Sequence, residues 1–219
     1  MSSGMTRTIK YMNYYTSRII LYVLGFTVGM VFYMTLLGGE FTADALMSNV
    51  AMMPMFCIFM GCLFFVVFNM SYGPLYANMQ LSMGSTRKEM VLGHIYAQFV
   101  FIIITTVIAE VFNAISVGGF DSNTGLYIAM AFFSYLVASA VGSIFGILVD
   151  RFGKVAYYVM VAIAAMGGGV FGALSVSVLR GGLVWSKSVA IPATIGSVVA
   201  FVASLVIYAI CARKKVVKA

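Results

Sequence analysis

Six long apolar stretches take up most of this chain, and the charged residues lie almost entirely between them. Hydrophobic residues make up 63% of the 219 residues and charged residues only 9%, which is too little charge for the surface of a soluble domain. A helix needs about 20 apolar residues to cross the hydrocarbon core of a bilayer. Because lipid offers the backbone no hydrogen-bond partner, such stretches must be helices. We therefore predict an all-α polytopic membrane protein with six transmembrane helices, at 19–37, 50–70, 90–112, 126–149, 155–178 and 189–211.

The basic residues predict how these spans are oriented. Only Arg180 and Lys187 lie on one side of the predicted spans, and the other Lys and Arg residues lie on the opposite side. Cytoplasmic loops carry the excess of Lys and Arg, so both termini are expected to be cytoplasmic. The net charge of +7 is then explained by the orientation of the spans and does not indicate nucleic-acid binding. The basic residues would lie at the inner membrane surface, where anionic lipid attracts them. The residues on the cytoplasmic side are Arg7, Lys10, Arg18, Arg87, Lys88, Arg151, Lys154, Arg213, Lys214, Lys215 and Lys218.

The segment before the first span has the pattern of an amphipathic helix. Arg7, Lys10 and Arg18 share one helical face, and Met5 and Ile9 lie on the other. Such a helix can lie flat in the headgroup layer, although a frayed basic tail would have the same composition. We expect three parts: an interfacial helix over 1–18, a transmembrane domain over 19–212 and a basic cytoplasmic tail over 213–219.

The chain carries no recognisable catalytic or cofactor-binding pattern. Its cysteines, Cys57, Cys62 and Cys211, are odd in number and lie inside predicted spans, so we interpret them as packing residues. A single histidine, His94, cannot form a metal-ligand cluster, and we expect it at the inner membrane surface. No phosphate-binding G-x-x-x-x-G-K-[ST] loop is present. We therefore predict no catalytic residue, metal or cofactor in this chain and no enzymatic activity of its own.

The predicted spans also lack the signature of an ion-coupled transporter. Such proteins place ionisable residues at mid-membrane depth, whereas Glu110 is the one acidic residue well inside a predicted span boundary. Glu110 could line the mouth of a cavity or reach the outer headgroups. Pro54 and Pro192 lie in the first turns of spans, where proline is tolerated, so no span is broken at its centre.

The loop between the second and third predicted spans contains a helix-turn-helix pattern. Pro74 suits the first position of a short helix, and Gly84 can end it in the left-handed conformation. Thr86 and Glu89 then have the spacing of a capping box that starts the next helix. The segment is either a rigid lever at the inner membrane surface, on which a soluble partner could act, or a plain loop with a turn.

The sequence Leu-Ser-Met-Gly-Ser-Thr-Arg-Lys-Glu over 81–89 resembles the "L-S-x-G-x-T/S-R-K" segment of six-span permeases of bacterial ABC exporters. These belong to the type-2 exporter superfamily, and Gram-positive members, such as phenol-soluble modulin exporters, export antimicrobial or toxin-like peptides or confer immunity to them. The resemblance implies two permease subunits in the bacterial plasma membrane, expected to form a homodimer, and two ATPase subunits that hold ATP and Mg. It implies a coupling helix at about 74–88 that docks on the ATPase through Tyr76, Asn78, Met79, Gln80, Ser82, Gly84, Arg87 and Lys88.

One part of the chain departs from the resembled superfamily. Many members have a re-entrant hairpin before the last span, whereas the segment 180–188 is short and carries the lone Trp185. Small residues four apart, which let membrane helices approach closely, occur twice. We expect Gly142 with Gly146, and Gly168 with Gly172, to pack within the subunit rather than between subunits.

Methionine is abundant, with 17 residues that concentrate in the first two predicted spans and their flanks. Flexible thioethers suit a path for amphipathic peptides, although methionine can equally fill lipid-facing positions.

The sequence thus predicts the permease subunit of an ATP-driven exporter, with a stand-alone carrier or channel and a non-transporting scaffold or sensor subunit as alternatives. The candidate path residues are Met30, Met34, Met55, Met60 and Glu110.

Overall fold

A computed structural model describes residues 3–38, 42–120, 124–153, 155, 158–159 and 187–213, and over these it contains helices and no strand. The fifth span, which we predicted at 155–178, and the segments with Trp185 and with Gly168 and Gly172 lie almost wholly outside the described residues. The elements are α1 (Ser3–Leu37), α2 (Ala43–Val50), α3 (Met53–Ser71), the π-helix η1 (Tyr72–Ala77), α4 (Asn78–Ser82), α5 (Arg87–Val117), α6 (Thr124–Phe152) and α8 (Lys187–Arg213).

Five of the described helices are long and apolar enough to cross a membrane. They are α1, α3, α5, α6 and α8, and each contains or overlaps one predicted span. Most extend beyond the apolar stretch, because helical hydrogen bonding continues through polar flanking residues at the membrane surface. The described chain therefore has the construction of a multi-pass membrane protein.

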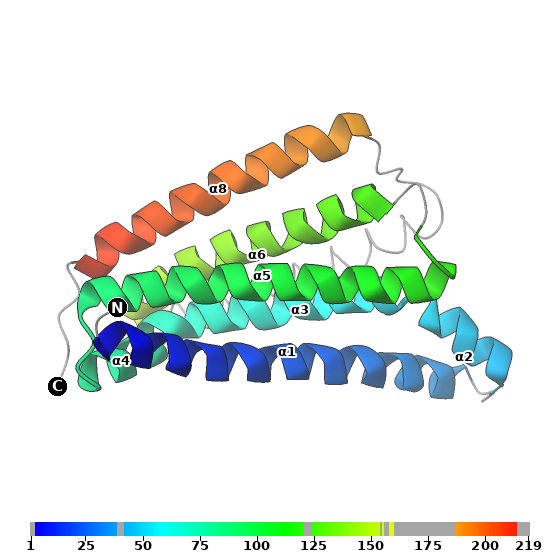
Figure 1. The fold of residues 1–219 in the computed structure, drawn as a ribbon, viewed down its shortest axis with the longest axis horizontal. Helices are drawn as coiled ribbons and strands as arrows, with labels where there is room; N and C mark the ends of the chain where they lie inside the picture. The colour runs from blue at the N-terminus through cyan, green and yellow to red at the C-terminus, as the bar shows by residue number, and fades with distance from the viewer. Residues whose placement is uncertain are drawn as a thin grey trace.

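The long helices form a bundle in which consecutive helices alternate in direction from α1 to α6 (Figure 1). α3 packs against α6, α6 against α8, and α1 against both α3 and α5. The start of α1, the short helix α4 and the end of α8 lie at the same end of the bundle, and α2 lies at the opposite end. We call the first of these the α4 end. That this end is cytoplasmic stays a prediction.

The separate interfacial helix that we predicted over 1–18 is not confirmed, because α1 is one uninterrupted helix. Arg7, Lys10 and Arg18 are exposed, as the amphipathic pattern predicted. The opposite face, however, forms a single buried stripe that continues from the first half of the helix into the second, so both halves pack on the bundle. The residues of this stripe are Gly4, Thr8, Met12, Thr16, Ile20, Val23, Thr27, Val31 and Thr35.

Two glycines of α6 bring it into backbone contact with α3, as we predicted for this pair. A Cβ atom added to Gly142 would lie 2.9 Å from the carbonyl oxygen of Val66, and one added to Gly146 would lie 2.7 Å from that of Asn69. Close backbone approach through small residues is how helices gain packing contacts in a membrane. Between α3 and α5, the rings of Phe65 and Phe101 stack with centroids 4.2 Å apart.

The cysteines differ in their surroundings. Cys57 is buried between α3 and α6, as the packing interpretation predicted, and the Tyr135 hydroxyl donates to its carbonyl oxygen at 3.3 Å. Cys211 is exposed on α8 and has no packing role within the described bundle, so the interpretation is wrong for that residue.

We expect Gly146→Ala to destabilise the protein by about 1–3 kcal/mol, because the added methyl group meets backbone that cannot move aside. Gly196→Ala is the matched control, since nothing lies within 4 Å of a Cβ added to Gly196 on α8. Thermal unfolding of both variants in the same detergent measures the difference. Equal stability of the two variants would contradict the close α3–α6 contact.

Candidate functional site

The connection from α3 to α5 has the local structure that the sequence predicted, with one difference at its start. Gly84 has a φ of +81°, in the left-handed region, and ends the helical stretch before it. The Thr86 backbone N–H donates to Glu89 Oε2 at 2.8 Å, and the Glu89 N–H donates to Thr86 Oγ1 at 3.3 Å, which completes a capping box at the start of α5. Both the glycine stop and the cap are therefore confirmed.

The difference is that no new helix starts at Pro74. The backbone stays helical from Met53 to Ser82, and Pro74 lies within the π-helical turn η1. Proline has no N–H to donate to the preceding turn, and a local widening to a π-helix is one way for a helix to continue past such a gap. α4 is therefore a continuation of α3 through η1 rather than a detached helix.

A buried tyrosine joins α4 to the spans on either side. Tyr72 is fully buried, and its hydroxyl lies 2.8 Å from Gln80 Oε1 and 3.0 Å from the carbonyl oxygen of Met90, so its hydrogen can be donated to either. Burial raises the pKa of Tyr72 well above its ordinary value and also raises that of Tyr76. Both side chains therefore stay neutral at physiological pH, and Tyr72 remains a hydrogen-bond donor between η1, α4 and α5.

The first turns of α1 also contact the connection between α3 and α5. The hydroxyls of Thr8 and Ser85 are hydrogen-bonded at 2.9 Å in a buried position. Tyr11 donates to the Met79 sulfur at 3.3 Å. A Cβ atom added to Gly93 of α5 would overlap the Thr8 methyl group, so the two helices meet at a glycine there. α4 and the turn after it are thus tied to α1 as well as to α3 and α5.

A cluster of buried polar side chains lies next to this connection, inside the bundle. The amide nitrogen Nε2 of Gln98 lies 2.6 Å from Asn69 Oδ1, 2.7 Å from His94 Nε2 and 3.1 Å from Ser143 Oγ. These four residues, which we call the polar cluster, come from α3, α5 and α6. Buried polar groups are costly unless they are hydrogen-bonded, so the cluster favours one mutual position of the three helices.

His94 belongs to this cluster, and our prediction that it lies at the membrane surface is wrong. The residue has no exposed surface. Its ring stacks on that of Tyr72 at 3.8 Å between centroids and lies 4.7 Å from that of Tyr208 on α8. Its position soon after the charged start of α5 predicts a surface location, but Tyr208 of α8 and Tyr72 of η1 cover it there. His94 therefore connects Tyr72 of η1 to Tyr208 of α8.

The predicted coupling residues differ in exposure: one is buried, two are half-buried and the others are exposed. Gln80 is fully buried against Tyr72, so it acts inside the protein. Tyr76 and Asn78 are half-buried, and the Tyr76 ring packs on that of Tyr15 at 4.8 Å. The exposed members are Met79, Ser82, Gly84, Arg87 and Lys88.

The candidate path residues do not gather at one place in the described structure. Met30 lines a groove of about 450 Å³ on the outer face of α1, and Met34 is exposed. Met60 packs against the core, and Met55 is half-buried on α3. Glu110 is half-buried on α5 and accepts a hydrogen bond from Asn113 at 3.3 Å. The described residues thus define no path through the bundle.

Sequence reasoning missed Asn69, Gln98 and Ser143. Each is a polar residue inside or at the end of an apolar span, and His94 and Gln98 are four apart, which places them on one face of α5. That spacing was visible in the sequence, but only the packing of three helices shows that these side chains meet. Among the described residues, no group of three or more His, Cys, Asp or Glu side chains could hold a metal ion.

Comparisons with known proteins identify no relative: no family model, curated protein or solved structure matches this chain. The functional interpretation therefore depends on the residues of the chain itself.

We expect Tyr72→Phe to lower the free energy of unfolding by about 1–3 kcal/mol, because it leaves the buried Gln80 oxygen without its donor. Tyr33→Phe, which removes the hydroxyl of a tyrosine that is 55% exposed, should be close to neutral. Thermal unfolding of both variants in one detergent measures this. A Tyr72→Phe variant as stable as Tyr33→Phe would show that the buried hydroxyl does not hold η1, α4 and α5 together.

Proposed function

We propose that this chain is the permease subunit of an ATP-driven exporter in a bacterial plasma membrane. Two copies would form the transport path, and two copies of a separate ATPase would drive it. The single observation that supports this most is the exposed apolar face of η1 and α4 at the α4 end of the bundle, joined by a glycine turn to a capped membrane span. We call this face and the turn after it the lever.

The exposed surface of the lever supports its proposed role as a docking site. Leu75, Met79 and Met83 are 58%, 48% and 43% exposed, and their spacing of four residues places them on one side of the helix. Exposed apolar patches with polar edges mark sites of protein–protein contact. Here Arg87 and Lys88 come after the patch, beyond the glycine turn, so a partner with apolar and acidic residues would fit.

The contacts of the lever would transmit a displacement of the lever to the membrane spans. The hydrogen bonds of Tyr72 and of Thr8 with Ser85 tie it to α1, α3 and α5. The polar cluster then connects α3, α5 and α6, and the tilted ring contact between His94 and Tyr208 extends the connection to α8. Displacement of the lever by an ATPase would therefore move several spans together, which alternating access requires.

The nature of the spans is the basis for the proposed substrate class. Among the described residues, the buried polar side chains include no Asp, Glu, Lys or Arg. A path built from such helices would favour amphipathic or largely apolar molecules, such as antimicrobial or toxin-like peptides, over ions. Because the described buried residues carry no ionisable acid or base of this kind and define no aqueous pore, the path is proposed to lie between two copies of the subunit.

Purification of the tagged full-length chain from its native membrane in a mild detergent tests the proposal. We expect a P-loop ATPase in about equal amount, identified by mass spectrometry. Absence of any ATPase across a series of mild detergents would overturn the exporter proposal in favour of a stand-alone carrier or a non-transporting scaffold.

We expect Gly84→Ala to weaken binding of the ATPase and to reduce its ATP-driven transport. Gly118→Ala is a matched control, because Gly84 and Gly118 have φ values of +81° and +77° and nothing within 4 Å of an added Cβ. Both substitutions should cost about 1–2 kcal/mol of backbone strain, but Gly118 lies at the other end of α5. Equal ATPase binding by the two variants would show that the lever is not the docking site.

A further inference from the structure

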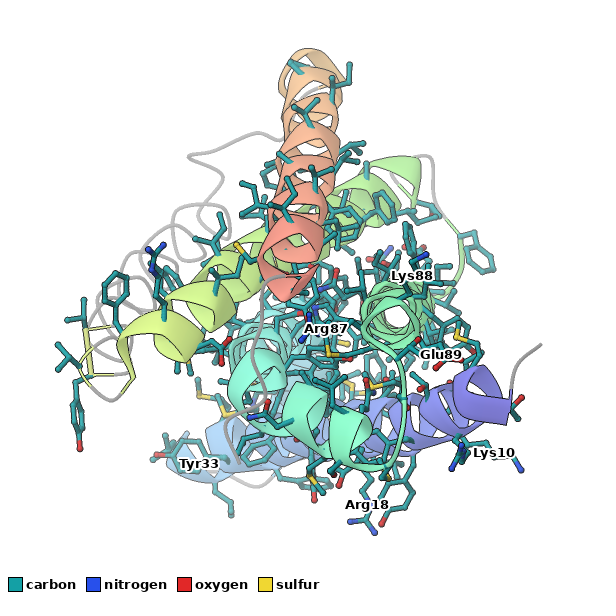
Figure 2. The ribbon with its side chains drawn as sticks, turned by 90° about the vertical axis from the view of Figure 1, so that its left-hand side faces the viewer. Lys10, Arg18, Tyr33, Arg87, Lys88 and Glu89 are labelled. Atoms are coloured by element: carbon teal, nitrogen blue, oxygen red, sulfur yellow. The ribbon has the colours of Figure 1, made fainter. Side chains whose placement is uncertain are left out.

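A groove lies between the start of α5 and the end of α8, beside the lever. Its volume is about 670 Å³, and it is lined by Arg87, Lys88, Val91, Leu92 and Ala209. Figure 2 looks along α5 from the α4 end of the bundle, with Arg87 on the side of α8 and Glu89 on the side of α1. The lining therefore combines two cations with an apolar wall contributed by both helices.

If α5 crosses the bilayer, the groove at its start would lie in the headgroup layer of the membrane. Arg87 and Lys88 are the first residues of a helix long and apolar enough to span the bilayer. One turn further along, Leu92 is 52% exposed and continues the groove toward the apolar part of α5. In such a span the charges would lie at the depth of lipid phosphates, and the apolar wall would lie at the depth of the first acyl carbons.

The binding chemistry comes from the side chains rather than from the start of the helix. The backbone N–H of Glu89 is already paired with Thr86 in the capping box. The cationic groups that line the groove are those of Arg87 and Lys88, and arginine in particular suits a phosphate because its planar fork can donate two parallel hydrogen bonds.

We propose that this groove binds one anionic phospholipid, with its phosphate between Arg87 and Lys88 and an acyl chain along Val91, Leu92 and Ala209. Basic pockets between transmembrane helices bind anionic headgroups in this manner. The apolar wall selects a lipid over a soluble phosphate, which would leave that wall without a partner. This inference does not depend on the exporter function and concerns the chain by itself.

A lipid in this groove would contact the connection between the lever and α8. Ala209 follows Tyr208, whose ring packs on His94 with centroids 4.7 Å apart, and His94 stacks on Tyr72. Among the described helices, α8 packs more extensively on α6 than on α5, and the groove lies on its α5 side. The bound lipid thereby joins α5 to α8 at the level of Tyr72.

The first test measures lipid binding to the purified full-length chain by native mass spectrometry, with phosphatidylglycerol and phosphatidylcholine as probes. We expect retention of one phosphatidylglycerol in preference to phosphatidylcholine. The double variant Arg87→Gln with Lys88→Gln should lose about 30-fold in affinity, since each cation near the surface contributes to anionic-lipid binding. The double variant Lys10→Gln with Arg18→Gln removes two exposed charges of α1 and should retain binding. Equal loss in both double variants would mean general surface attraction and would overturn the site.

The second test fills the groove without changing its charge. Ala209→Phe should abolish retention of phosphatidylglycerol, whereas Ala203→Phe, at an exposed position of the same helix that does not line the groove, should leave it unchanged. Glycerol 1-phosphate supplies the headgroup anion without acyl chains and is expected not to compete. Competition by glycerol 1-phosphate, or unchanged lipid binding in Ala209→Phe, would overturn the proposal of a lipid. Unfolding temperatures in phosphatidylcholine check that each variant is folded.

Discussion

The architecture depends on the cost of leaving polar groups without partners in an apolar medium. Each unsatisfied N–H or C=O in hydrocarbon costs several kcal/mol, so the chain crosses it as helices. The same cost explains why Gln98, Asn69, His94 and Ser143 are found together, because each would be expensive alone. Apolar side chains fill the space between helices without direction, whereas these four define the mutual position of α3, α5 and α6.

The α4 end concentrates the features from which a function can be inferred. The exposed lever, the Tyr72 hydroxyl beneath it, the polar cluster and the groove between α5 and α8 are in contact or adjacent through single side chains. The rest of the described bundle is held largely by apolar packing and by glycines at close helix contacts. A force or a ligand acting at the α4 end would therefore reach α1, α3, α5, α6 and α8.

Arg87 and Lys88 have a place in both proposals. They follow the exposed methionines of the lever, and they also line the groove against α8. Lipid binding is a property of the chain alone, whereas docking of an ATPase requires a partner, so the two roles separate experimentally. If both hold, the headgroup layer and the ATPase would meet at these two cations, and the lipid composition of the membrane would affect coupling.

The sequence by itself determined the helical class, five of the spans, the glycine stop at Gly84 and the capping box of Thr86 and Glu89. These follow from apolar length and from local backbone chemistry, which neighbouring residues decide. Tertiary structure alone decided the burial of His94 and Gln80, the merging of residues 3–18 into α1 and the meeting of Asn69, Gln98 and Ser143. Such contacts depend on which helix faces pack together, and in largely apolar helices the sequence pattern marks those faces only weakly.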